Sequence, residues 1–186
     1  MKIMSFTTTK EFRAWLAKNH KLSEGILVRI YKKESGVETL TYAEALDQAL
    51  CFGWIDGQKN PYDTKSWLQK FTPRRPKGKW SKNNTQHVER LIESGDMTAA
   101  GLKEVKAAKA DGRWKAAYES SSTAKIPDDF LKALAFNKSA EAFFKTLNKT
   151  NLYSIAYRLQ TAKKPETRQK RIRDIVEKLA RGEKFN

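Results

Sequence analysis

A carboxylate, Asp56, lies close to a tryptophan and between two glycines in the stretch LCFGWIDGQKNPYD, residues 50–63. Successive side chains of an extended strand point to opposite faces, so Trp54 and Asp56 would share one face of a strand here. Glycines at positions 53 and 57 let a ligand or another backbone approach closely. The pattern indicates a buried acid that lines a pocket together with Trp54 and that serves as an acid–base group.

Two adjacent arginines follow in the stretch FTPRRPKGKWSKNN, residues 71–84, with a proline on each side of the pair. Proline restricts its own backbone and that of the preceding residue, so the pair is expected to be stiff and extended. Guanidinium groups bind phosphate or carboxylate through two parallel hydrogen bonds. A serine at the start of the next helix adds free N–H groups that attract an anion. The side chains expected to converge on one anion are Arg74, Arg75, Lys79, Ser81 and Lys82, with Trp80 as an aromatic wall.

Both motifs also have a structural interpretation. Asp56 could form an ion pair with Arg74 or Arg75, which would lock the strand to the loop. The loop could instead cross the core, anchored by Trp80, with its charges in solvent. Because the motifs flank one predicted hairpin, the sequence predicts that five of these residues lie close together in space: Trp54, Asp56, Arg74, Arg75 and Trp80.

Other chemistry-bearing residues are few. His20 and His87 are the only histidines, and no spacing of His, Cys, Asp or Glu resembles a metal site, so we expect neither a metal nor another cofactor. Cys51 stands among apolar residues near the end of a predicted helix, where burial and the helix dipole raise a thiol pKa. We therefore expect it to be buried and unreactive. No Gly-x-Ser-x-Gly elbow or phosphate-binding glycine loop occurs.

The bulk composition limits the class of protein. The chain has 186 residues, 39% of them hydrophobic, which is enough for a packed core. No apolar run approaches the roughly 18 residues of a membrane helix. The N-terminal residues lack the apolar stretch of a signal peptide, and the single cysteine suits a reducing compartment. We therefore expect a cytoplasmic protein without a transmembrane segment.

The formal net charge of +16 is concentrated in two stretches. Residues 65–82 carry seven bases and no acid, and residues 158–173 carry seven bases and one acid. Such a field attracts nucleic acid, anionic headgroups or phosphorylated small molecules, although it could also serve solubility alone. We expect at most weak, salt-dependent and sequence-nonspecific binding to nucleic acid, since no base-reading motif is present. The sequence does not indicate a protein partner.

The periodicity predicts an α+β fold: a small, mainly antiparallel sheet with helices, followed by a C-terminal helical subdomain. Strands are expected over residues 26–33, 54–60 and 66–72, with helices beginning near Thr8, Thr41, Ser81 and Thr98. About four short helices then follow Pro127. The expected domains are residues 1–122 and 123–186.

Several long stretches resemble one family, the YdeI/OmpD-associated or bacteriocin-protection proteins. The stretches are TYAEALDQALCFGWIDG, FTPRRPKGKWSKNN, MTAAGLKEVKAAKADGRW and KPETRQKRIRDIVEKLARG. The resemblance extends from Phe6 to about Gly182 and implies a role in envelope stress and in tolerance of antimicrobial peptides. It supplies no reaction and no catalytic residues.

Two classes of function therefore stay open. The first is a cytosolic, basic anion-binding or interaction protein linked to stress tolerance. The second is an enzyme acting on a small anionic substrate, with Asp56 as the acid–base group and Arg74 and Arg75 as the anion clamp. The scarcity of histidine and the lack of a nucleophile motif favour the first.

Overall fold

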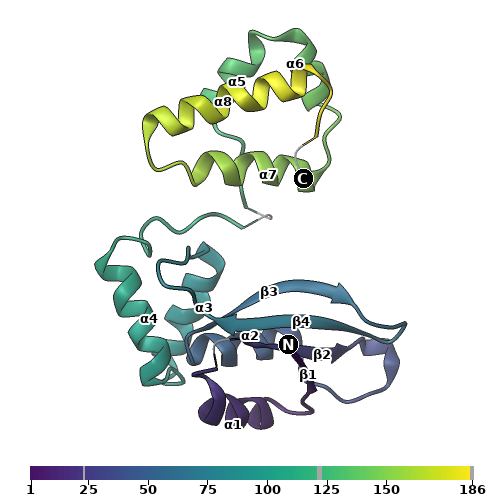
Figure 1. Ribbon diagram of the computed structural model, residues 1–186, viewed down its shortest axis with the longest axis vertical. Helices are drawn as coiled ribbons and strands as arrows, with labels where there is room; N and C mark the ends of the chain where they lie inside the picture. Colours follow the sequence, from purple (N-terminus) through teal and green to yellow (C-terminus); the bar gives the residue numbers. More distant parts are fainter. Residues whose placement is uncertain (23, 121–122, 185–186) are drawn as a thin grey trace. The chain divides into compact units, whose positions relative to one another are not determined.

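The computed structural model describes residues 1–22, 24–120 and 123–184. The chain forms two compact units, which are described separately here (Figure 1). The first unit comprises residues 1–80 and 84–117, and the second comprises residues 81–83 and 118–186. The domain boundary expected at residue 122 lies outside the described residues.

The first unit contains a four-stranded sheet with the strand order β1-β2-β4-β3. Its strands are β1 (Lys2–Ser5), β2 (Ile26–Tyr31), β3 (Trp54–Pro61) and β4 (Ser66–Pro73). The β2–β4 and β3–β4 pairs are antiparallel, as predicted, whereas β1 runs parallel to β2. The edge strand β1 was not predicted because it is only four residues long and lacks a clear apolar alternation.

The helices expected near Thr8, Thr41 and Thr98 are capped by these residues. The helices of the first unit are α1 (Thr9–Asn19), the short 3₁₀ helix η1 (Lys33–Ser35), which was not predicted, α2 (Tyr42–Cys51), α3 (Lys82–Glu93) and α4 (Ala99–Ala110). The first two residues of α3, Lys82 and Asn83, belong to the second unit. The Thr8 hydroxyl accepts a hydrogen bond from the Glu11 backbone N–H. Thr41 and Glu44 form a complete capping box, which satisfies backbone donors at the helix start.

One face of the sheet packs on α1 and α2, which lie on the same side of it in Figure 1. Ile26, Val28 and Ile30 alternate along β2 with partly exposed residues, so they share a face. Together with Phe71 they form one core with side chains of both helices, including Phe12, Leu16, Leu46 and Leu50. Sequence alternation thus sets which face of the sheet is buried.

Helix α4 approaches α2 closely at Gly101. A Cβ atom at this position would lie 2.3 Å from the Cys51 carbonyl oxygen and 2.7 Å from the Met97 terminal methyl group. Thr98, the cap of α4, donates to the same Cys51 oxygen over 2.6 Å. Cys51 itself is fully buried, as expected, and burial raises the pKa of its thiol.

The second unit is helical in its C-terminal part. Residues 123–184 contain α5 (Asp128–Ala135), α6 (Lys138–Phe144), α7 (Lys149–Gln160) and α8 (Pro165–Ala180). The four helices enclose their own core, which includes Phe130, Ile155, Leu159, Ile175 and Leu179. The α+β class and the helical C-terminal part are therefore confirmed. Within the described residues, no helix combines the length and the apolar character needed to cross a membrane.

We expect Gly101→Ala to lower the free energy of unfolding by about 2 kcal/mol, because the new methyl group overpacks the α2–α4 contact. Helix propensity alone would predict the opposite, a gain of about 1 kcal/mol. Urea denaturation followed by circular dichroism measures the difference. Ala107→Gly at an exposed position of the same helix is the control and should cost about 1 kcal/mol. A stabilising Gly101→Ala would contradict the close contact.

Candidate functional site

Trp54 lies in the core, and its expected role in lining a pocket stays a prediction. Its side chain is 0% exposed, and its indole N–H donates to the His20 carbonyl oxygen over 2.8 Å. The indole also contacts Trp15 edge to face, with ring centroids 5.9 Å apart. Gly53, which precedes it, adopts a positive φ of 76° that lets the chain turn sharply from α2 into β3.

Asp56 pairs with a tyrosine. The Tyr42 hydroxyl, on the first residue of α2, donates to Asp56 Oδ2 over 2.8 Å. Within the described residues, the carboxylate forms no ion pair with Arg74 or Arg75, so the predicted ionic lock between strand and loop is not formed. Burial, followed by the charge and the hydrogen bond of Asp56, raises the pKa of Tyr42 above its ordinary value near 10.

Tyr42 also lines a groove of 730 Å³ beside the end of β2. Trp67 and Lys33 are among the other lining residues, and Lys59 places its ammonium 4.3 Å from the centre of the Trp67 ring. Asp56 is not part of this lining. Any chemistry of the carboxylate in the groove would therefore have to pass through the Tyr42 hydroxyl.

The arginine loop is built around two tryptophans. The Arg74 guanidinium lies 3.4 Å from the centre of the Trp80 ring, and the Trp80 and Trp114 ring centroids are 4.8 Å apart. Lys109 places its ammonium 5.2 Å from the centre of the Trp114 ring. A cation therefore lies at each end of a tryptophan pair, an arrangement stabilised by cation–π attraction.

Hydrogen bonds fix the backbone of residues 74–79, which we call the basic turn. The Arg74 N–H donates to the Gly53 carbonyl oxygen over 3.0 Å, and its Nη1 donates to the Lys79 carbonyl oxygen over 3.3 Å. Across the turn, Gly78 N–H donates to the Arg75 carbonyl oxygen over 2.9 Å. Arg113 Nη1 donates a hydrogen bond to the Gly78 carbonyl oxygen over 2.9 Å. The turn is thus tied to β3 at one end and to the segment after α4 at the other.

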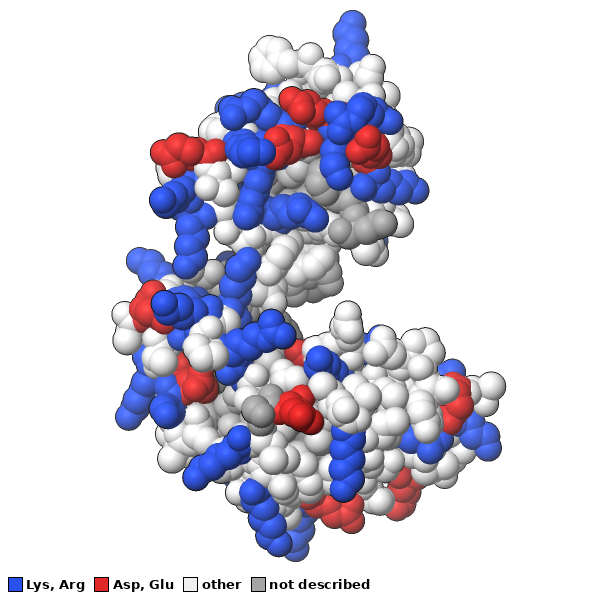
Figure 2. Space-filling model, in the orientation of Figure 1, with Lys and Arg blue, Asp and Glu red and all other residues white. Residues whose placement is uncertain are grey.

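Exposed positive charge surrounds this turn. Arg75, Lys77 and Lys79 are all exposed. Lys77 adopts a positive φ of 61°, which is uncommon for a residue with a side chain. Figure 2 shows further Lys and Arg side chains gathered over α4, whose sequence supplies Lys103, Lys106 and Lys109. The first unit therefore presents fixed positive charge next to an aromatic pair.

Ser81 and Lys82 belong to the second unit. Ser81 forms an isolated parallel β-bridge with Tyr118, and the Lys82 backbone N–H donates to the Tyr118 carbonyl oxygen over 2.8 Å. The Lys82 ammonium forms an ion pair with Glu119, and this hydrogen bond holds the pKa of Glu119 below its ordinary value. The acid compensates the Lys82 charge, and convergence of Ser81 and Lys82 with the basic turn on one anion stays a prediction.

The second base-rich stretch is largely occupied by contacts inside its own unit. Arg168 forms an ion pair with Asp129 over 2.6 Å, and Lys170 pairs with Asp174 over 2.8 Å. Arg171 donates to the Arg158 carbonyl oxygen. Part of the charge that suggested nucleic-acid binding therefore stabilises the helical bundle, and the joint basic face of both stretches stays a prediction.

Sequence reasoning missed three partners: Tyr42, Arg113 and Trp114. None of them is close in sequence to its partner: Tyr42 is 14 residues from Asp56, and Arg113 is 35 residues from Gly78. Trp114 is 34 residues from Trp80. All three lie in stretches that resemble the family, TYAEALDQALCFGWIDG and MTAAGLKEVKAAKADGRW, and this resemblance is the signal that could have indicated them. The remaining histidine cluster ties α2 to α3, with His87 Nδ1 and Arg90 Nη2 each 2.7 Å from an Asp47 oxygen. Among the described residues, no group of three or more His, Cys, Asp or Glu could hold a metal ion.

Two family models match the chain. Residues 4–104, more than half of the chain, match a domain of unknown function, DUF8412. Residues 123–182 match the family described as bacteriocin-protection, YdeI or OmpD-associated. The chain belongs to the DUF8412 family. Its residues 123–182 form a domain of the bacteriocin-protection, YdeI or OmpD-associated family. No curated protein and no solved structure matches the chain.

We expect Asp56→Asn to lower the pKa of Tyr42 while leaving it above the ordinary value, because burial is the larger cause and remains. Absorbance at alkaline pH follows tyrosine ionisation, and the difference from Tyr42→Phe assigns the signal to Tyr42. In the native protein the folded state keeps this proton above pH 10 while the unfolded chain loses it. Stability from this group should therefore be lost as the pH rises above about 10. An unchanged tyrosine titration in Asp56→Asn would contradict the pairing.

Proposed function

We propose that the chain is a cytoplasmic anion-binding protein that holds its ligand at the basic turn. The observation that carries this proposal is the turn itself, from which the exposed side chains of Arg75 and Lys77 project. Hydrogen bonds tie the turn backbone to Gly53 and Arg113, and a further bond joins Gly78 to Arg75 across the turn. Binding at a preorganised site loses less conformational entropy than binding at a mobile loop. No acid occurs between residues 65 and 82 to neutralise these bases from within the segment.

The aromatic pair supports the same proposal. Stacking of Arg74 on Trp80 orients the start of the turn and leaves the exposed Arg75 as the guanidinium directed to solvent. Arg75 offers a planar fork for phosphate or carboxylate, and Lys77 offers a point charge beside it. The ligand class is therefore a phosphate-bearing or polycarboxylate anion.

Bacteriocin protection, the role after which the family matched by residues 123–182 is named, sets the context of this activity. We propose that the protein acts in tolerance of envelope stress and antimicrobial peptides through its anionic ligand. Direct capture of the peptides fits less well, because such peptides are mostly cationic and a protein of net charge +16 repels them.

An enzyme that combines Asp56 with the arginine pair receives no support from the geometry. The carboxylate pairs with Tyr42, whereas Arg74 stacks on Trp80. Nonspecific binding of nucleic acid would use the same exposed charges, and its salt dependence separates it from binding of a small anion.

The test is a calorimetric titration of the full chain with inorganic tripolyphosphate at physiological salt. Arg75→Gln with Lys77→Gln should weaken binding by about tenfold or more, because each charged hydrogen bond contributes about 1.5 kcal/mol or more. Both side chains are exposed, so the fold should persist.

Lys10→Gln with Lys18→Gln removes the same charge from exposed positions of α1 and is the matched control. Equal weakening by both double variants would show that net charge alone attracts the anion, and would refute a site at the basic turn. A short DNA duplex that binds at physiological salt, and more tightly than tripolyphosphate, would favour nucleic acid instead.

A further inference from the structure

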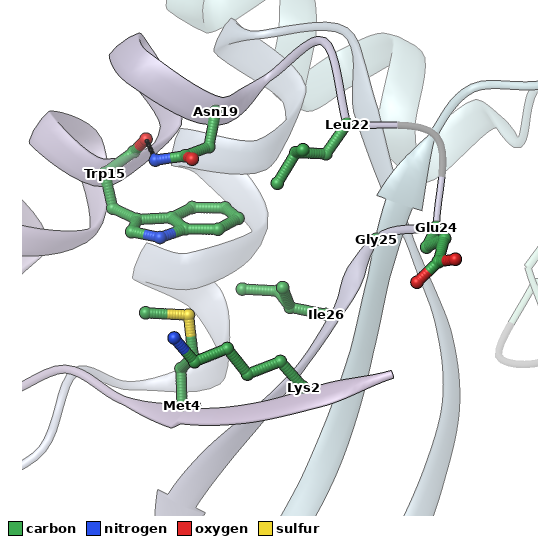
Figure 3. A pocket seen from close by; sticks show the side chains of 8 residues that line it. All are labelled: Lys2, Met4, Trp15, Asn19, Leu22, Glu24, Gly25 and Ile26. Carbon is green, nitrogen blue, oxygen red and sulfur yellow. Dashed lines mark hydrogen bonds between the residues drawn. The ribbon is translucent and has the colours of Figure 1, made fainter.

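A second, separate pocket of 400 Å³ opens in the first unit between α1, β1 and the start of β2 (Figure 3). Its main lining residues are Lys2, Met4, Trp15, Asn19, Leu22 and Ile26. None of them belongs to the basic turn. The volume lies at the lower end of the range for small-molecule sites.

The walls of the pocket are apolar. The side chains of Met4, Leu22 and Ile26 point toward the Trp15 indole in Figure 3. Leu22 is 47% exposed, although it stands beside three apolar neighbours. A ligand with an apolar body would cover this exposed surface, at a gain of about 25 cal/mol for each Å² removed from water.

Trp15 provides a rigid surface for such a ligand. Its ring is packed against Trp54 at 5.9 Å and against Phe12 at 6.4 Å, measured between ring centroids. The Asn19 side-chain amide donates to the Trp15 carbonyl oxygen over 2.8 Å, which fixes the end of α1 beneath the pocket. An aromatic ring held in this way offers its free surface for stacking without further loss of conformational freedom.

Two hydrogen-bond donors, the Lys2 ammonium and the Trp15 indole N–H, are among the polar groups of the pocket. Figure 3 shows the Lys2 side chain running beside Met4, with its ammonium end toward Trp15. The indole nitrogen lies on the edge of the ring that faces Met4. Among the described residues, neither nitrogen has a hydrogen-bond partner or an ion pair. The Glu24 carboxylate lies at the opposite end of the pocket from Trp15, so the charge beside the ring is positive.

Gly25 holds the mouth of the pocket in place. It adopts a positive φ of 70°, and a Cβ atom there would lie 2.3 Å from the Phe71 carbonyl oxygen. The chain before β2 can therefore press against β4 only with glycine at this position. This contact fixes the end of β2 from which Ile26 enters the pocket.

We infer that this pocket binds a small aromatic carboxylate. The ring of the ligand stacks on Trp15 and covers Leu22, and its carboxylate accepts hydrogen bonds from the Lys2 ammonium and the Trp15 indole N–H. The combination of apolar side chains around Trp15 with a positive charge and an indole donor beside it favours a ligand with one negative charge on a flat apolar body. A polyphosphate is excluded by the same features, since it would have to bury several charges against Met4 and Leu22.

The test compares naphthalene-2-carboxylate with its neutral amide, which has the same ring, by calorimetry on the full chain. The carboxylate should bind about tenfold more tightly, as expected for one charge-assisted hydrogen bond. Lys2→Gln should abolish that difference, and Leu22→Ser should weaken binding of both compounds.

Lys10→Gln and Val37→Ser are the controls, and both should leave binding unaltered. Lys10→Gln repeats the lysine change, and Val37→Ser replaces another exposed aliphatic residue with serine, both outside this pocket. Circular dichroism establishes that all four variants are folded. Lack of saturable binding by the native protein, or binding that Lys2→Gln and Leu22→Ser leave unchanged, would overturn the inference.

Discussion

Burial of the Trp54 indole is the interaction on which the first unit depends. The ring enters the core directly after the sharp turn at Gly53 and finds its one polar partner in the His20 carbonyl oxygen. A buried indole N–H without such a partner would cost on the order of 1–3 kcal/mol. This single hydrogen bond therefore joins the end of α1 to the start of β3, and the ring contact with Trp15 sets one wall of the small pocket.

The same short segment positions the basic turn. The Gly53 carbonyl oxygen accepts a hydrogen bond from the Arg74 N–H, so the first residue of the turn is bound to the residue that precedes Trp54. The buried segment around Trp54 therefore holds the basic turn in place, while the charged groups of Arg75 and Lys77 remain in water. Asp56, two residues after Trp54, meets Tyr42 of α2. Neighbouring residues of one motif consequently serve different parts of the unit.

Local sequence rules predicted the elements well and the partners poorly. Thr8 and Thr41 cap their helices because the capping signal is contained within four residues. The antiparallel strands were predicted from alternation, which is equally local. Pairing of Asp56 with Tyr42, and of Trp80 with Trp114, depends on how helices dock, and charge alone had suggested the arginines as the partners of Asp56. Ser81 and Lys82 directly follow the basic turn in sequence, yet they belong to the other unit.

Because residues 81–83 belong to the second unit, the two units are not divided at a single point of the sequence. The two family matches follow one another along the chain, at residues 4–104 and 123–182, as if two modules had been fused end to end. The folded units are interleaved instead, because residues 81–83 pair with Tyr118 and Glu119 and belong to the C-terminal unit. A recombination event between residues 104 and 123 would exchange one module and leave three residues of its fold behind.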